Sequence, residues 1–235
     1  MVREEREEPM TGRKLKKMIR EILAQDDLER ALQQILVFRE NSVVGPLISL
    51  FCSKDPLVKG KAVSALGVVV RQITDKEPES GRIIMRRLMW SLNDESGGIG
   101  WGAPEAMGEI MARCELLADE YHKILSSYIV PGANYLEIPA LQRGALWGIM
   151  RLASVYPEKL PYLLPHLPRF FNDADGPIKA FAAKACLLID PSKTDHIPEA
   201  ISIDPSPFDM YWDGKIETCS LNTFLDKSLN PRVSG

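Results

Sequence analysis

Two tryptophans and four charged residues stand at helical spacing in the middle of the chain, and their types suit them to recognise a ligand. An aromatic and two acids recur every four residues in the first set, and two bases and an aromatic do so in the second: Trp101, Glu105, Glu109; Arg143, Trp147, Arg151. At 100° per residue, each set lies on the side of its helix away from the apolar positions. The sequence therefore predicts two polar, aromatic ridges.

The two ridges have two interpretations. In one, the acids of the first pair with the arginines of the second, and the tryptophans stack between them. In the other, the aromatics provide contact area in a groove, and the charges select a peptide carrying both signs or a basic segment. These interpretations overlap, because paired side chains can still line a groove. Asp94 and Glu95, just before the first ridge, are candidates for its rim.

The sequence holds no recognisable catalytic or metal-binding pattern. None of the histidines, His122, His166 and His196, has a carboxylate or a second histidine four residues later. No G-x-S-x-G turn and no phosphate loop occurs. The four cysteines are scattered without the paired spacing of a zinc site or a disulfide framework. We therefore predict no catalytic residue, no metal and no cofactor, and a protein that is not an enzyme.

The glycine-rich run Gly97-Gly98-Ile99-Gly100-Trp101-Gly102 is the unusual loop of the chain. Glycines before a helix can direct backbone N–H groups at an anion. The neighbouring acids Asp94, Glu95 and Glu105 would repel a phosphate, so a cation or the N-terminal end of the helix suits them better. We favour a widened turn that needs positive φ.

The helices that must carry the ridges belong to a repeat. Gly67, Gly108 and Gly148 stand at matching points of three apolar helices, about forty residues apart, and Lys184-Ala185-Cys186 is a looser fourth copy. Each copy follows a polar turn and another apolar helix, expected over residues 83–92, 121–129 and 160–171. With an amphipathic pair at the start, the pattern predicts about five helical hairpins between Thr11 and Ile189.

A helical hairpin repeated at this period resembles the HEAT family, including its lyase-type HEAT-like variants. The resemblance implies an all-α fold, a right-handed α-solenoid over residues 11–189. It also implies a ladder between neighbouring repeats, for which Asp55 with Lys61 and Asp173 with Lys179 have the family's spacing. The second and third repeats depart from that pattern.

The flanking segments differ from the repeat. We expect residues 1–10, a charged stretch without a secretory signal, to be a disordered tail. Residues 190–235 are rich in proline, and Asp213-Gly214 between β-formers predicts a type I′ hairpin. That hairpin either caps the exposed end of the solenoid or docks a partner. No apolar run is long enough to cross a bilayer, and we expect a cytoplasmic, reduced protein.

Charge and family resemblance together bear on the partner. The formal charge of −3 disfavours nucleic acid, and residues 173–217 carry nine acids and four bases, which would repel a DNA backbone. We therefore predict a non-catalytic scaffold that binds a protein or peptide on its concave face. HEAT-like DNA glycosylases are an alternative, because Trp101, Trp147, Arg143 and Asp94 resemble their groove residues. A chromophore-lyase-type accessory is another. No pattern specifies an oligomeric state.

Overall fold

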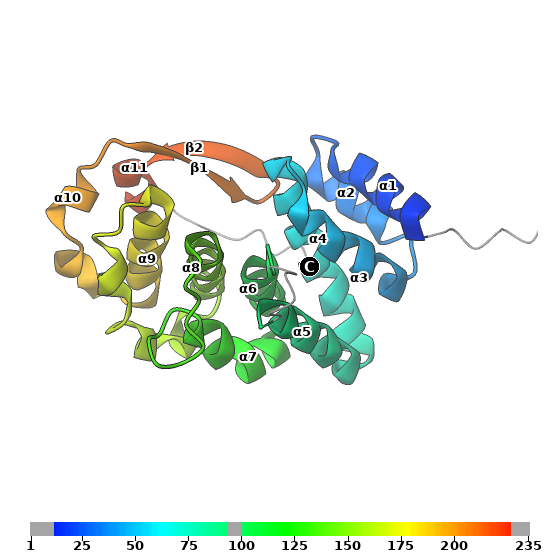
Figure 1. The fold of residues 1–235 in the computed structure, drawn as a ribbon, viewed down its shortest axis with the longest axis horizontal. Coiled ribbons are helices and arrows are strands. Elements are labelled where there is room, and N and C mark those ends of the chain that lie inside the picture. The colour runs from blue at the N-terminus through cyan, green and yellow to red at the C-terminus, as the bar shows by residue number, and fades with distance from the viewer. Residues whose placement is uncertain (1–11, 94–99, 227–235) are drawn as a thin grey trace, which may run out of the picture.

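The computed structural model describes residues 12–93 and 100–226 (Figure 1). These residues are mostly helical, with one two-stranded antiparallel sheet, so the expected all-α class is confirmed. The predicted tail over residues 1–10 lies outside the described residues, as do the rim candidates Asp94 and Glu95. No helix in the described ranges combines the length and apolarity needed to cross a membrane.

The α-helices of the repeat region come in chain order before the C-terminal elements. They are α1 (Gly12–Leu23), α2 (Leu28–Ile35), α3 (Glu40–Ser49), α4 (Pro56–Lys76), α5 (Pro78–Leu92), α6 (Ala103–Arg113), α7 (Glu115–Ser127), α8 (Pro139–Ala153) and α9 (Gly176–Ile189). The helices α4, α6, α8 and α9 contact one another in sequence and form an inner layer, while α5 and α7 lie on the outer side of the arc (Figure 1).

The repeated glycines lie where neighbouring inner helices meet. A methyl group on Gly67 would lie 2.7 Å from the Cγ atom of Glu109, and one on Gly148 would lie 2.6 Å from the carbonyl oxygen of Pro104. A methyl group on Gly108 would overlap the backbone of Gly148. The period of about forty residues therefore marks positions at which a side chain would push the inner helices apart.

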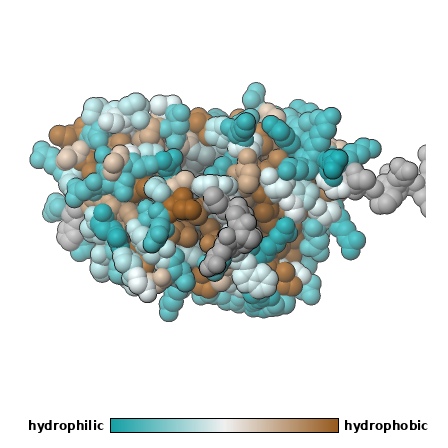
Figure 2. Space-filling view, viewed as in Figure 1, coloured by the Kyte–Doolittle hydropathy of each residue, from teal (hydrophilic) through white to brown (hydrophobic). Residues whose placement is uncertain are grey.

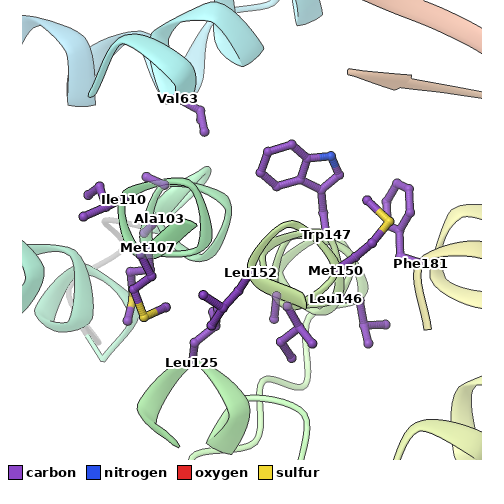
Figure 3. Packing of buried hydrophobic residues seen from close by; sticks show 14 of the residues in the cluster. Val63, Ala103, Met107, Ile110, Leu125, Leu146, Trp147, Met150, Leu152 and Phe181 are labelled. Atoms are coloured by element: carbon purple, nitrogen blue, oxygen red, sulfur yellow. The ribbon is translucent and has the colours of Figure 1, made fainter. Parts of the chain in front are cut away.

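Hydrophobic side chains fill the space between the layers. In Figure 3, Met107, Leu125 and Leu152 meet between α6, α7 and α8, and all three are fully buried. Trp147 points from α8 in a different direction, toward the inner side of the arc. The packed core thus holds the inner helices in place, and residues such as Trp147 on their other side remain outside this contact between the layers.

Two lysines depart from the ladder that the family resemblance implies. Asp55 caps α4 by accepting hydrogen bonds from the Leu57 and Val58 N–H groups. The fully buried Lys61 instead donates to the carbonyl oxygens of residues 25 and 26, in the turn before α2, and its burial lowers its pKa. Lys179 pairs with Asp204 at 3.6 Å. Lys61 and Lys179 therefore pair with neither Asp55 nor Asp173, the two aspartates of the implied ladder.

Residues 160–171, expected to form a helix, contain short 3₁₀ turns instead. These turns are η3 (Pro161–Leu163) and η4 (Leu167–Phe170), and a further 3₁₀ turn, η2 (Pro157–Lys159), precedes them. Prolines recur every three or four residues here, at 157, 161, 165 and 168. Each lacks a backbone N–H and clashes with the preceding turn of an α-helix, so local sterics override the apolar periodicity that suggested a helix.

The predicted hairpin is confirmed. Strand β1 (Pro207–Trp212) pairs with β2 (Lys215–Ser220), and Asp213 and Gly214 both have positive φ, 42° and 88°, as a type I′ turn requires. It lies across the inner side of the arc rather than on its end (Figure 1). Helix α9 is covered by η5 (Pro191–His196) and α11 (Leu221–Asp226), and α10 (Glu199–Ser202) packs against α11.

Candidate protein-interaction groove

The β1–β2 hairpin crosses the inner side of the arc (Figure 1). A pocket lies between the hairpin and α4, α6, α8 and α9, and we call this pocket the groove. We call the hairpin, residues 207–220, the strap. On the face seen in Figure 2, polar residues predominate around the edge of the molecule, and hydrophobic residues reach the surface near the middle. Of the ridge residues, Glu105, Arg143 and Trp147 line this groove, and Arg151 contacts the strap through Trp212.

Trp147 lies under the strap with only 6% of its surface exposed. Its Nε1 atom donates a hydrogen bond to the carbonyl oxygen of Tyr211 at 3.1 Å, and its ring meets the edge of Trp212 at 6.1 Å between centroids. Trp147, which was expected on a ridge away from the core, is therefore buried, and its role in binding a partner stays a prediction. The physical reason for its burial is that a strand from the far end of the chain covers it.

Glu109 forms the centre of a buried ionic cluster. One carboxylate oxygen accepts from Arg151 Nε at 2.6 Å, and the other accepts from Arg113 Nε at 2.6 Å. Burial alone would raise the pKa of Glu109, but the two guanidinium groups lower it below its ordinary value. Glu109 and Arg151, both 2% exposed, therefore form a structural link between α6 and α8 and are not open to solvent.

The strap also covers the charge of Arg151. The Arg151 guanidinium carbon lies 5.1 Å from the Trp212 ring centroid, a cation–π contact. Its Nη1 atom is buried and has no hydrogen-bond partner among the described residues. The cluster therefore retains one unused donor directly beside the strap.

Glu105 and Arg143 do not pair with each other, and each pairs instead with a residue from the inner helix on its other side. Glu105 pairs with Lys59 of α4 at 3.1 Å, and Arg143 pairs with Asp175, which caps α9. The expected pairing of Glu105 with Arg143 is therefore wrong. The carboxylate of Glu105 lies over Gly144, where a side chain would overlap it, and Arg143 extends toward the next helix. The charged pairs still join successive inner helices, from α4 through α6 and α8 to the N-terminus of α9.

Trp101 is half-buried in the turn before α6 and packs against the core. The positive φ expected of this turn occurs at Gly102, 74°, where a methyl group would collide with Phe51. The described part of the glycine run thus behaves as a widened turn, and residues 97–99 lie outside the described ranges.

A cavity of about 250 Å³ remains between the strap and the inner helices. Val63, Trp147 and Phe181 line it from the helices, and Met210 and Tyr211 line it from the strap. The pair of Lys59 with Glu105, described above, lies at its wall. An apolar side chain or a small apolar group with a polar end would suit such a lining.

Sequence reasoning did not identify Tyr211 as a groove residue. Its hydroxyl lies 2.8 Å from Ser64 Oγ, and its ring occupies the space left by Gly60, where a methyl group would overlap it. Burial raises the pKa of the Tyr211 hydroxyl. A signal was present: Met210-Tyr211-Trp212 puts large side chains on both faces of one strand, which is typical of a strand covered on both sides.

The described residues contain no group of three or more histidine, cysteine or acidic side chains placed to hold a metal ion. No protein-family model and no curated protein matches the chain. Among solved structures, the chain is similar to an engineered protein whose crystal structure came from a structural genomics consortium, with 16% sequence identity and a TM-score of 0.44. The alignment covers 74% of this chain and 78% of that one.

Proposed function

We propose that this protein is a HEAT-like α-solenoid that serves as a non-catalytic scaffold, holding a segment of another protein on its inner face. The observation that carries the proposal is that this face already holds an extended strand, β1. Trp147 from α8 binds a backbone carbonyl of that strand, and Ser64 from α4 binds a side-chain hydroxyl. A groove with such contacts is suited to an extended polypeptide.

The residue types of the groove support a protein partner. Tryptophan, tyrosine and arginine are the side chains that most often dominate binding energy at protein interfaces. Both signs of charge lie beside these side chains, on Lys59, Glu105 and Arg143. This arrangement favours a partner segment that itself carries both signs. Repeat proteins of this kind present their inner surface to extended partners.

An affinity purification with matched variants tests the proposal. The tagged full chain is incubated with lysate of its source cells, and bound proteins are quantified by mass spectrometry. We expect a protein at stoichiometric level that is retained by Lys17→Glu, on the exposed side of α1, and reduced about fivefold or more by Arg143→Glu at the groove. Equal capture by both variants, or no stoichiometric protein, would contradict it.

A second measurement separates this function from the glycosylase alternative. Fluorescence anisotropy of a labelled DNA duplex is recorded with the full chain at rising salt concentration. Binding that weakens steeply with salt would support contact with the phosphate backbone. The scaffold proposal expects no such binding at ordinary ionic strength.

A further inference from the structure

The strap extends from α9 to α2 across the inner layer. At its base, Phe208 packs edge-on against Phe181 of α9, with ring centroids 6.0 Å apart. At its tip, a methyl group on Gly214 would lie 2.6 Å from the Cβ atom of Leu28 in α2. The strand between these contacts therefore runs along the groove in the manner of a bound segment.

Three contacts show what the groove recognises in this strand. The Trp147 indole takes a backbone carbonyl, which any extended chain offers. The ring of Tyr211 fills the space beside Gly60, and the hydroxyl of that ring is within hydrogen-bond distance of Ser64. The Arg151 guanidinium then takes the next aromatic ring, that of Trp212. The groove thus contacts one backbone carbonyl of the strand and the side chains of two consecutive aromatic residues.

The strap leaves part of the groove unfilled and one hydrogen-bond donor beside it without an acceptor in the described part of the chain. The cavity of about 250 Å³ lies between it and the helices. The side chain of Arg151 is 3% exposed, and its Nη1 donor has no partner among the described residues. An unpaired buried donor is costly, so a segment that brings an acceptor to it would bind better than the strap does.

We propose that the groove is a receptor for a partner segment in extended conformation that carries two consecutive aromatic residues followed by an acidic residue, and that the strap occupies this receptor until the partner displaces it. This inference rests on the proposed scaffold function and names the chemistry of its partner. The acid is specified by Arg151, whose free donor lies beside the aromatic pair. In the strap itself, Asp213 follows Tyr211 and Trp212, but it makes no hydrogen bond to Arg151 Nη1, so an acid that reaches this atom would distinguish the partner from the strap.

Competition within one chain sets how strongly the partner must bind. A tethered segment has an effective concentration on the order of millimolar, so the strap outcompetes weak ligands. If the groove is open in one molecule of about a hundred, the apparent Kd of the partner is raised about a hundredfold. A substitution that weakens the strap without altering the groove should therefore increase the affinity for a peptide added in trans.

The test uses the full chain and a fluorescein-labelled peptide with the sequence of residues 207–214. Binding is measured by anisotropy for the wild type, for Tyr211→Ala, and for Lys215→Ala, a matched change at an exposed position of the strap. We expect Tyr211→Ala to bind the peptide at least about tenfold more tightly than the wild type, and Lys215→Ala to match the wild type. A peptide with alanine at both aromatic positions should not bind either.

A groove-side change completes the test. Adding Trp147→Phe to Tyr211→Ala removes the indole donor but keeps an aromatic ring, so peptide affinity should fall about fivefold or more. Circular dichroism checks folding, and Trp212→Leu replaces Tyr211→Ala as the strap-weakening change if that variant does not fold. Equal peptide affinity for the wild type and a folded, strap-weakened variant would overturn the proposal.

Two further outcomes separate the possible occupants. If the wild type forms dimers as its concentration rises and the strap-weakened variant does not, the occupant is the strap of a second copy and the proposal of a distinct partner fails. If the peptide binds as expected but no lysate protein is captured, the scaffold function fails while the receptor chemistry stands. If a lysate protein is captured equally with and without the strap-weakening change, that protein uses another surface and this inference fails.

Discussion

The Nε1 atom of Trp147 donates a hydrogen bond to the carbonyl oxygen of Tyr211 at 3.1 Å, joining residues 64 positions apart in the chain. The bond connects an inner helix to the C-terminal strap. It places the side chain expected to meet a partner against a strand of the same chain. The groove and its covering strand therefore form one packed unit, and the following predictions test the contacts that hold it together.

Removing the Tyr211 hydroxyl should weaken the docking of the strap. Tyr211→Phe leaves Ser64 Oγ without its 2.8 Å partner while keeping the ring in the gap at Gly60. We expect the free energy of unfolding to fall by about 1 kcal/mol, measured by urea denaturation. Tyr135→Phe, which keeps the ring beneath Arg169, is the matched control and should change it by less than about 0.5 kcal/mol.

Neutralising Glu109 should be far more damaging. Glu109→Gln leaves the Arg113 and Arg151 side chains, 11% and 3% exposed, without their shared carboxylate. A loss of about 3–5 kcal/mol in unfolding free energy is expected, because breaking one side of a buried ion pair leaves an uncompensated charge. Asp75→Asn, which breaks the exposed pair with Arg71, should cost less than about 1 kcal/mol. Similar losses for both variants would argue against the buried cluster.

The same carboxylate predicts an acid dependence. Its two guanidinium partners overcome the effect of burial and lower the pKa of Glu109 below 4.5 in the folded protein. The stabilisation is therefore fully present above the unfolded pKa and is lost as the pH falls through the lower folded value. Urea denaturation between neutral pH and pH 3 should show a steeper loss for the wild type than for Glu109→Gln.

His122 should produce a separate pH effect near neutrality. Burial, followed by the charges of Lys123 and Lys159, lowers its pKa below 6.5. The unfolded state therefore binds more protons in this window, so stability is complete above pH 6.5 and declines as the pH falls through the folded pKa. His122→Gln should flatten the stability profile between pH 5 and 7, and proton NMR of the ring should show the lowered pKa directly. A measured pKa above 6.5 for the His122 ring would contradict the predicted lowering of this pKa.

The repeated glycines offer a test of inner-helix packing. Gly108→Ala places a methyl group into the backbone of Gly148, and we expect it to lower the unfolding free energy by about 1–3 kcal/mol. Gly45→Ala, inside α3 with no atom within 4 Å of the new methyl group, should raise it by about 0.5–1 kcal/mol. Thermal or urea denaturation measures both changes in unfolding free energy. Changes of opposite sign would show that the repeated glycines are needed for contact between inner helices, whereas equal changes would contradict this.

Local signals predicted most of the secondary structure. The proline after Asp55 and the Asp213-Gly214 turn each specify an element through their own backbone preferences, and both elements are present. The forty-residue period marked Gly67, Gly108 and Gly148 as matching positions, and each of them lies against a neighbouring inner helix. Residues 160–171 were the exception, because their apolar spacing favoured a helix and their prolines prevented it.

The candidate site was predicted only in part. The wheel placed Glu109 and Arg151 on facing ridges, and they do pair. It could not show that Glu105 pairs with Lys59, since that choice depends on how far neighbouring helices are rotated and spaced. Nor could it place Trp147 beneath a strand, since side-chain periodicity within one helix contains no information about a segment that arrives from elsewhere.

By itself, the sequence determined the helical hairpins, the glycines at their contacts and the existence of the C-terminal turn, because each depends on interactions within a few residues or on a repeated pattern. Only the tertiary structure decided that the strap lies along the groove. That placement depends on contacts such as Ser64 with Tyr211, 147 positions apart, whose energy arises only when the inner helices are already assembled at the right spacing.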